Sequence, residues 1–588
     1  MIDFDNYING YWKKNNSIPK DKDVYNEYVI LEEKILNDLK QICEKDGTIV
    51  GDFYRSGLKD SSRVLEELHT WFNYIDTHTV VEFIYFLRPL GVNVFFDVHV
   101  SPDSKNNKYN IMHIVHNILP MGNKAYYLED QYKIYLYQYR FFIEKMFMLA
   151  GLDISVVDSL IQLEQSIAYH SLDIEELRNV VVRYNKTELS KLMNDDAWKL
   201  YTGKGEQIID YPPFYRWISE QISDKINEPI IKNYAKLKIL IKYAPIINKE
   251  FCNWHFYFFN TTMSGISTPK DKYRKSIIAT NSCLGPLIGK IYCDKYYHES
   301  NVLKIFENIV SELKSAIFNN SWMSNNCKIK SLNKLKNIKI KIGHPKKGFW
   351  KDYSDCPNVA KNNFFKNMVE FNKYLDNKDM IKCGKEIVAE EWQINSHIVN
   401  AFFDPVLNEV VLPAGILRPP FVSYGTCTTS IISNYGIIGF IIGHELTHAF
   451  DDQGSQYNEH GILQQWWDSQ TIKNYKMLQN DIVGQYQKLG MNGRLTLGEN
   501  IADNGGLLLA YRALATELKT IQWNPKLFFI AFAAIWRSLI NETSYTRHKL
   551  SDVHASSTAR INGTVYSCSL FFEAFNLKKP SKIINIWN

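Results

Sequence analysis

The feature that most restricts this chain is residues 437–452, IIGFIIGHELTHAFDD, for which we predict a helix. His444 and His448 stand four positions apart in this segment. Residues i and i+4 of a helix share one face, so both imidazoles can meet a single metal ion. Glu445 lies one step round the helix, where its carboxylate can hold and deprotonate a water bound to that ion. Two nitrogen ligands, a carboxylate and one open position are the arrangement of a catalytic zinc site.

The residues around this pattern favour a buried helix. Residues 437–442 are apolar apart from one glycine, and a helix that is apolar nearly all round is typically buried. Gly436, Gly439 and Gly443 are small enough to let another backbone approach. Buried histidines and a glutamate would be costly polar groups unless something binds them. The alternative is a surface helix whose histidines and glutamate are solvated, and the five-residue pattern alone does not exclude it.

Length and composition restrict the class of protein further. A chain of 588 residues is too long for one core, so we expect at least two domains. The net charge of +5 is mild and does not indicate a nucleic-acid partner. The N-terminus has no apolar signal segment, and no apolar run approaches the roughly 20 residues that span a bilayer. The nine cysteines are scattered without a C-x-x-C pair, which favours a reduced, intracellular protein.

The first half of the chain is mostly helical by its apolar spacing. Helices are expected over residues 25–44, 130–150, 154–169 and 302–318. A Lys-rich stretch at 328–351 follows, and we interpret it as a solvated connector, with a polyanion-binding patch as the less favoured alternative. The predicted domains are an N-terminal helical lobe over 1–330, whose first stretch can pack on the catalytic lobe, a connector over 331–390, and a catalytic domain over 391–588.

Short β-rich runs precede the metal-binding helix. Residues 398–403 and 409–412 are predicted strands, separated by an Asp-Pro turn at Asp404 and Pro405. A strand beside the metal with a free edge could bind an extended peptide by strand addition. A simple hairpin in the core is the other possibility, and the sequence does not choose between them.

Four more polar residues can complete such a site. Glu499 and Asp503 stand at i and i+4 in a Gly-rich segment, so they share a helix face. Glu499 is the candidate third ligand, and Asp503 could accept the free N–H of a ligand histidine. His554 and Arg560 could stabilise the oxyanion that forms when water attacks an amide. Taken alone, such pairs are usually solvated or structural.

Several longer motifs stand in a fixed order along the chain. They are YINGYW at 7–12, VSPD at 100–103, LIGKIY at 287–292, VNAF at 399–402, PAGILRPPF at 413–421, HELTHAFDD at 444–452, GENIADNGG at 498–506, DVH at 552–554 and RING at 560–563. With these motifs the chain resembles the neprilysin and endothelin-converting-enzyme family of zinc metallopeptidases over nearly its whole length.

The resemblance implies a mainly α fold with a small mixed β-sheet (α+β). A thermolysin-like catalytic lobe and a helical cap lobe would enclose a central chamber that admits only short peptides. One Zn²⁺ would be bound by His444, His448 and Glu499. The resemblance also implies that Glu445 is the general base and proton shuttle, that Asp503 orients His444 and that His554 stabilises the oxyanion. Arg560 would bind the carbonyl of the residue after the scissile bond, and Asn400 and Ala401 would pair with the substrate backbone. Phe440, Ile441 and Trp536 would line an apolar pocket that favours cleavage before Phe or Leu.

The chain departs from the extracellular members of that family. They begin with a cytosolic tail and a membrane anchor, whereas this sequence starts at the first motif, and Leu577 and Ile584 stand where those members have cysteines. We therefore expect a soluble, intracellular and monomeric protein without a membrane anchor, with the cytoplasm as its simplest location. The segment before His444 is slightly longer than in the family and the span from His448 to Glu499 is shorter, which leaves the pocket's preference open.

Three functions compete at this point. The leading one is a zinc endopeptidase that acts on oligopeptides. A catalytically silent peptide-binding protein of the same fold is the second, and the intact set of ligands, base and oxyanion donors argues against it. A zinc hydrolase with a substrate other than a peptide is the third, and a free strand edge beside the metal would argue against that one.

Overall fold

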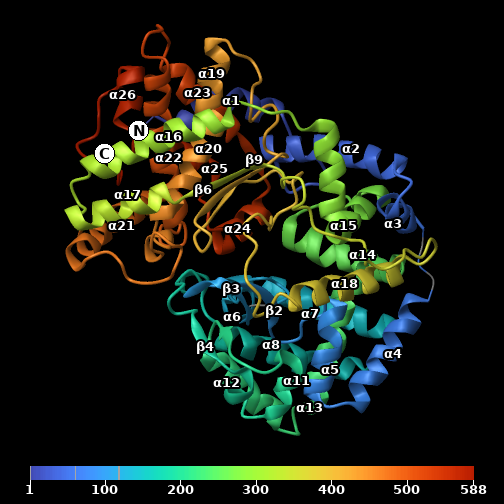
Figure 1. The fold of residues 1–588 in the computed structure, drawn as a ribbon. Coiled ribbons are helices and arrows are strands. Elements are labelled where there is room, and N and C mark those ends of the chain that lie inside the picture. The colour runs from blue at the N-terminus through green and yellow to red at the C-terminus, as the bar shows by residue number, and fades with distance from the viewer. Residues whose placement is uncertain (1, 60, 62, 117–118, 588) are drawn as a thin grey trace.

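The computed structural model describes residues 2–59, 61, 63–116 and 119–587 of the chain. Helices dominate this part of the protein and its strands form three small sheets, so the predicted α+β class is confirmed. The helices gather in two lobes (Figure 1). None of the described helices is both long and apolar enough to cross a membrane.

The lower lobe of Figure 1, which we call the cap, covers residues 64–263. Its four-stranded sheet has the order β2-β3-β5-β4, in which only β3 and β5 run parallel. Its elements are α4 (Val64–Thr77), α5 (Val80–Leu87), β2 (Asp97–Asp103), β3 (Asn106–Val115), α6 (Ala125–Leu128), α7 (Lys133–Leu149), α8 (Val157–His170), α9 (Ile174–Leu177), β4 (Asn185–Thr187), α10 (Leu189–Leu192), α11 (Lys199–Thr202), β5 (Gln207–Ile209), α12 (Pro212–Ser223), α13 (Glu228–Ile247) and α14 (Lys249–His255).

The upper lobe, which we call the main lobe, combines both ends of the chain. Its elements are α1 (Phe4–Asn15), β1 (Val24–Asn26), α2 (Glu27–Lys45), α3 (Ile49–Gly57), α15 (Lys272–Tyr296), α16 (Val302–Asn319), α17 (Asn325–Lys336), β6 (Lys339–Gly343), α18 (Phe364–Met380), β7 (Phe402–Asp404), β8 (Glu409–Pro413), α19 (Thr428–Asn434), α20 (Phe440–Thr447), α21 (Ser469–Lys488), α22 (Leu497–Glu517), α23 (Lys526–Ile535), β9 (Ser538–Ile540), α24 (Glu542–Ser551), α25 (Ser557–Tyr566) and α26 (Ser569–Phe575).

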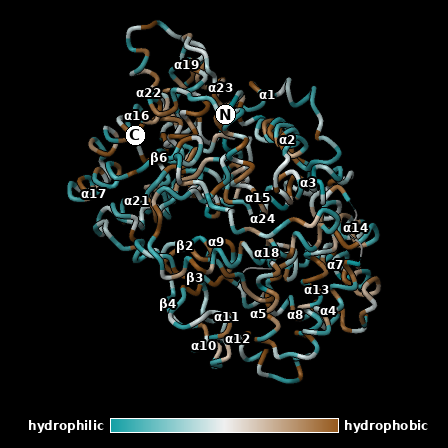
Figure 2. Tube along the Cα trace, turned by 45° about the vertical axis from the view of Figure 1, so that its right-hand side comes forward, coloured by the Kyte–Doolittle hydropathy of each residue, from teal (hydrophilic) through white to brown (hydrophobic). Residues whose placement is uncertain are grey.

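The helices follow the apolar spacing closely. The expected helices at 25–44, 130–150, 154–169 and 302–318 correspond to α2, α7, α8 and α16, with ends shifted by a few residues. The tube in Figure 2 alternates between brown and teal along the helices of the cap, as amphipathic helices do. Local periodicity is therefore a sound guide to which segments become helices.

Each lobe has its own hydrophobic core, and the cores divide the chain differently from the predicted ranges. Residues 4–54 and 277–335 supply apolar side chains to the core that also holds α20 and α22, whereas the cap core draws on residues 64–263. Helix α18 contributes to both, with Phe371 in the main core and Phe365 in the cap core. Periodicity shows that a helix has an apolar face but not which core that face joins, so the boundary at 330 does not follow the packing.

The Lys-rich stretch at 328–351 is not the solvated connector that we expected. It contains the end of α17 and all of β6, which pairs in parallel with β8. Lys334 is fully buried and donates hydrogen bonds of 2.7 Å to the carbonyl oxygens of Ala449, Gly454 and Tyr457. These acceptors lie just beyond α20, so the ammonium group of this lysine satisfies carbonyl groups there, which composition alone does not reveal.

The main-lobe sheet places a strand edge beside α20. Its order is β6-β8-β7, with β7 antiparallel to β8, so β7 is an edge strand. Helix α20 contacts both β7 and β8. The predicted strand at 409–412 corresponds to β8. The one predicted at 398–403 is displaced, because residues 398–401 are not in a strand and β7 includes Asp404 of the predicted turn. A second pairing joins β1 to β9, which brings the N-terminal segment to the rim of the same site.

Candidate metal centre

Helices α20 and α22 approach closely because two glycines face each other. A Cβ atom added to Gly443 would lie 2.9 Å from the Cα of Gly506, and one added to Gly506 would lie 2.7 Å from the backbone nitrogen of His444. Both distances are too short for any side chain, so the two helices can touch only at glycine. This contact sets His444 of α20, and His448 in the 3-10 turn that directly follows it, opposite the acidic residues of α22.

Three candidate ligand atoms converge between these helices. The Nε2 atoms of His444 and His448 are 3.0 Å apart. One oxygen of Glu499, Oε2, lies 3.1 Å from the first nitrogen and 3.6 Å from the second. That oxygen is buried, and imidazole nitrogens are its polar neighbours, although none of the described residues makes a well-aligned hydrogen bond to it. A buried carboxylate oxygen without a well-aligned donor is costly unless a cation meets it.

These distances fit a tetrahedral zinc ion. Ligand atoms about 2.0–2.1 Å from zinc lie roughly 3.3 Å from one another in a tetrahedron. The three observed separations of 3.0, 3.1 and 3.6 Å scatter around that value. Glu445 also belongs to the cluster, but it and the two histidines are grouped only within 4.8 Å. The shorter distances favour Glu499 as the third donor.

Each histidine is held by a carboxylate on its other nitrogen. Nδ1 of His444 lies 2.8 Å from Oδ1 of Asp503, and Nδ1 of His448 lies 2.7 Å from Oδ2 of Asp451. Such bonds fix the tautomer and turn Nε2 toward the metal. Asp503 also accepts two hydrogen bonds from Arg560, of 2.8 and 2.6 Å. Burial raises the pKa of Asp503, but Arg560 and His444 outweigh it and hold the pKa at about 2.

Glu445 stands beside these donors with an environment suited to a base. It is only 6% exposed, and burial raises the pKa of its carboxyl group although the neighbouring His444 and His448 lower it. A raised pKa brings a carboxylate closer to the operating range of a general base near neutral pH. The sequence therefore places a proton acceptor next to the ligand atoms.

His554 approaches the cluster from the C-terminal end of the chain. Its Nε2 lies 3.2 Å from Oε2 of Glu499, and its Nδ1 lies 2.9 Å from Oδ1 of Asp552. Burial lowers the pKa of His554, but the carboxylates of Glu499 and Asp552 raise it to about 9. The other oxygen of Asp552 pairs with His548 at 3.0 Å. A protonated imidazole here can donate a hydrogen bond to a developing negative charge.

A cavity of about 1060 Å³ opens in front of these residues. Asn400 and Ala401, which directly precede the edge strand β7, contribute to its wall, as do Phe440, Ile441 and Trp536. The ring of Trp536 lies 3.9 Å from the guanidinium of Arg560 and 6.0 Å from the ring of Phe440. All twelve residues expected at the site therefore lie at the metal cluster or on this cavity.

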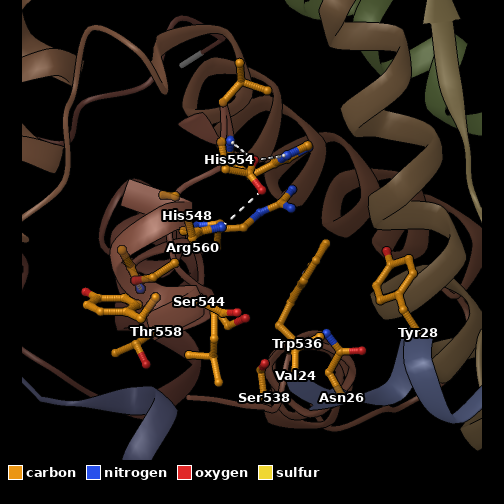
Figure 3. A pocket seen from close by; sticks show the side chains of 18 of the residues that line it. Val24, Asn26, Tyr28, Trp536, Ser538, Ser544, His548, His554, Thr558 and Arg560 are labelled. Atoms are coloured by element: carbon orange, nitrogen blue, oxygen red, sulfur yellow. Dashed lines mark hydrogen bonds and ion pairs between the residues drawn. The ribbon is translucent and has the colours of Figure 1, made fainter. Parts of the chain in front are cut away.

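Sequence reasoning missed several residues of the same site. Figure 3 shows Tyr28 and Trp536 beside the cavity, with Arg560 and His554 facing it. Tyr28 packs 5.6 Å from Trp536, but no local pattern points to it because it arrives through the β1–β9 pairing. Asp451 and Asp552 were detectable, since each lies within three residues of the histidine that it holds.

Comparison with known sequences decides the family. Two sequence profiles, both described as peptidase family M13, match residues 2–345 and residues 400–586. The chain belongs to peptidase family M13. It is therefore a zinc metalloendopeptidase, and the resemblance to the neprilysin and endothelin-converting-enzyme family is confirmed.

Curated relatives span almost the whole chain. Mouse neprilysin is 27% identical over 680 residues, covering 100% of this chain and 89% of the relative. Human endothelin-converting enzyme 1 is 26% identical over 646 residues, covering 97% of this chain and 82% of the relative. The similarity is thus spread over both lobes.

Solved structures share the fold. Zinc metalloprotease ZMP1 of Mycobacterium tuberculosis in complex with an inhibitor superposes with a TM-score of 0.93 at 24% identity, covering 100% of this chain and 97% of the other. PEPO of Lactobacillus rhamnosis superposes with a TM-score of 0.87 at 20% identity, covering 99% of each chain. A structure of ZMP1 in an open state superposes with a TM-score of 0.72 at 23% identity, covering 99% of this chain and 97% of the other.

Proposed function

We propose that this M13 peptidase hydrolyses short oligopeptides at a single zinc ion held by His444, His448 and Glu499. The observation that carries the proposal is the set of three ligand atoms 3.0–3.6 Å apart, two imidazole nitrogens and one buried carboxylate oxygen. Zinc bound there would acidify a water and polarise the scissile carbonyl group.

The residues around the zinc ligands would move the protons. Glu445 takes a proton from the attacking water and later gives it to the leaving amine. His554, held by Asp552, donates to the oxyanion that develops on the carbonyl. Arg560 uses Nε and Nη2 on Asp503, which leaves Nη1 for the carbonyl of the residue after the scissile bond. Asp503 then connects that arginine to His444.

The wall of the cavity would set the substrate. An extended peptide would lie along the free edge of β7, with Asn400 and Ala401 on its backbone. Phe440, Ile441 and Trp536 form an apolar surface that favours cleavage on the N-terminal side of residues such as Phe and Leu. The free edge beside the metal supports a peptide over other substrates of zinc hydrolases.

Access to the cavity would require the lobes to separate. ZMP1 has been captured both with an inhibitor and in an open state, and this chain is closer to the inhibitor complex, with TM-scores of 0.93 and 0.72. We infer that the conformation described above is the closed one. All nine cysteines are unpaired, which supports the expected reducing compartment.

Glu445→Gln tests the proposal against the silent peptide-binding alternative. A mixture of random peptides is digested by wild type and variant, and the products are read by mass spectrometry. We expect wild type to cleave before apolar residues and the variant to keep its zinc while losing about 10³-fold in kcat, because the proton acceptor is gone. Binding of peptides by wild type without cleavage would favour the silent alternative, and full activity of the variant would remove Glu445 from the mechanism.

A further inference from the structure

One residue of the cap, Arg178, forms an ion pair with a main-lobe residue next to those that hold the zinc ligands. Arg178 directly follows α9, and its Nη2 lies 3.0 Å from each carboxylate oxygen of Asp452 in the main lobe. The two side chains are only 10% and 19% exposed. An ion pair so far from bulk water is screened little and loses much when one partner is removed.

The pair adjoins the residues that hold the zinc ligands. Asp452 follows Asp451, whose Oδ2 orients His448. A Cβ atom on Gly498 would lie 2.5 Å from Oδ1 of Asp452 and 2.7 Å from Nη2 of Arg178, and Gly498 is joined directly to Glu499. Arg178 therefore packs against Gly498, which directly precedes the ligand Glu499, and pairs with Asp452, which directly follows the carboxylate that holds His448.

The charges explain why a cation is needed there. Asp451, Asp452 and Glu499 bring three carboxyl groups into one region with little water. Burial and the neighbouring Asp451 raise the pKa of Asp452 and Arg178 lowers it, which together leave it at about 6. Zinc would compensate the charge of Glu499, whereas Asp452 is paired with Arg178 of the cap.

A second contact ties the same cap segment to the start of α22. Nδ2 of Asn492 donates to Oε1 of Glu175 at 2.7 Å, and Asn492 also caps the turn that leads into α22 through the backbone nitrogens of Arg494 and Leu495. The cap segment around α9 thus contacts the main lobe at two places: at Asp452, after α20, and at Asn492, before α22.

We propose that Arg178 is a positioning residue that makes the geometry of the zinc ligands depend on the closed position of the cap. The inference rests on the proposed zinc function. In the closed form Arg178 fixes Asp452 and so the Asp451–His448 bond. When the cap moves away, Asp452 loses its cation and the two adjacent acids repel each other, which loosens the orientation of His448. Hydrolysis would then be confined to the closed chamber.

The test compares zinc release and turnover in four full-length single variants and one double variant, Arg178→Ala with Asp452→Asn. Arg178→Ala removes the cation, Arg178→Lys keeps a charge without the planar guanidinium, and Asp452→Asn removes the other partner. Arg140→Ala is the matched control, because Arg140 pairs with Glu144 and Asp158 inside the cap, at 2.6 Å to each. Each zinc-loaded protein is mixed with a chromogenic chelator to measure the rate of zinc release, and kcat and KM are measured on one cleaved peptide.

We expect Arg178→Ala to release zinc roughly tenfold faster than wild type. Its kcat should fall, whereas its KM should stay near the wild-type value. Arg178→Lys should recover part of both, and Arg140→Ala should match wild type. Adding Asp452→Asn to Arg178→Ala should recover part of the zinc retention, because it removes the carboxylate that repels Asp451 once the arginine is gone.

Zinc release at the wild-type rate from a folded Arg178→Ala protein would overturn the proposal and leave Arg178 as a mere contact between lobes. Should Arg178→Ala fail to fold, Arg178→Lys and Asp452→Asn decide the question. The proposal would be overturned if both variants released zinc at the wild-type rate and kept the wild-type kcat. Failure of wild type to cleave any peptide would refute the proposed function instead, while the zinc-release comparison would still decide the role of Arg178.

Discussion

Glu499 in the metal centre and Glu164 in the cap are both carboxyl groups removed from bulk water, but their surroundings shift the pKa in opposite directions. Burial raises the pKa of both. Near Glu499 the imidazoles of His554 and His448 outweigh burial and hold its pKa well below the usual range. Near Glu164 burial prevails and raises the pKa to about 7, although Lys238 and two tyrosine hydroxyls lower it.

The neighbours account for this difference. Glu164 on α8 is fully buried and accepts a 3.0 Å hydrogen bond from the hydroxyl of Tyr139, with Tyr127 and Tyr234 close by. Apolar residues and phenols surround it together with Lys238, so much of this carboxyl group is neutral near pH 7. The metal centre instead gathers imidazoles and a guanidinium round its acids. Burial alone does not make a binding site; the charge of the neighbours keeps a carboxylate ionised and ready for a cation.

Removing the ionised carboxylate should have the largest effect. Glu499→Ala should weaken zinc binding by more than about 100-fold, because it deletes a donor atom rather than a residue that supports one. Zinc affinity is measured by titration in chelator buffers. Glu164→Gln is the matched control and should bind zinc as wild type does. An affinity of Glu499→Ala within a few-fold of wild type would exclude this residue as a ligand.

Removing the support of a ligand should have a smaller effect. Asp503→Ala should weaken zinc retention by tens-fold, because His444 loses the carboxylate that fixes its tautomer. Asp552→Ala is the control in this case, since Asp552 holds His554 and not a ligand. The same chelator titration measures both. Equal affinities for Asp503→Ala and wild type would argue against the supporting role.

The smallest effect is expected in the cap. The folded-state pKa of Glu164 is above the unfolded one, so its contribution to stability is full below about pH 4.5 and is lost as the pH rises toward about 7. The slope for one proton is at most about 1.4 kcal/mol per pH unit. Glu164→Gln should remove this slope from the free energy of unfolding, measured in urea between pH 5 and 8.

Glu144→Gln, on the exposed side of α7, should keep the wild-type pH dependence. An unchanged slope in Glu164→Gln would show that the buried carboxyl is ionised in the cap as well, which would remove the contrast between the two lobes.

The sequence predicted the local parts of this molecule well. The spacing of His444 and His448 and the Glu499–Asp503 pair in α22 depend only on helix geometry. Helix α22 formed where expected, whereas α20 ends at Thr447 and continues only as a 3-10 turn to Phe450, short of the predicted end at 452. The glycine contact between the two helices was foreseen for Gly443, but its partner Gly506 was not, because a contact between segments distant in the chain leaves no local pattern.

The errors also have a common physical origin. Lys334 stands in a Lys-rich stretch that is typical of a solvated segment, but its side chain is buried and donates hydrogen bonds to three carbonyl groups. Tyr28 and Arg178 reach the site through pairings with segments hundreds of residues away. The assignment of a helix to one lobe or the other likewise depends on long-range packing, so the boundary at residue 330 could not be derived from periodicity.

A crystal structure of the zinc-loaded protein, with anomalous data on both sides of the zinc absorption edge, tests the central claim most directly. We predict one anomalous peak, bonded at about 2.0–2.2 Å to Nε2 of His444, Nε2 of His448 and a carboxylate oxygen of Glu499, with Glu445 beside it but not bound. A peak held by Glu445 in place of Glu499, or no peak between α20 and α22, would contradict it.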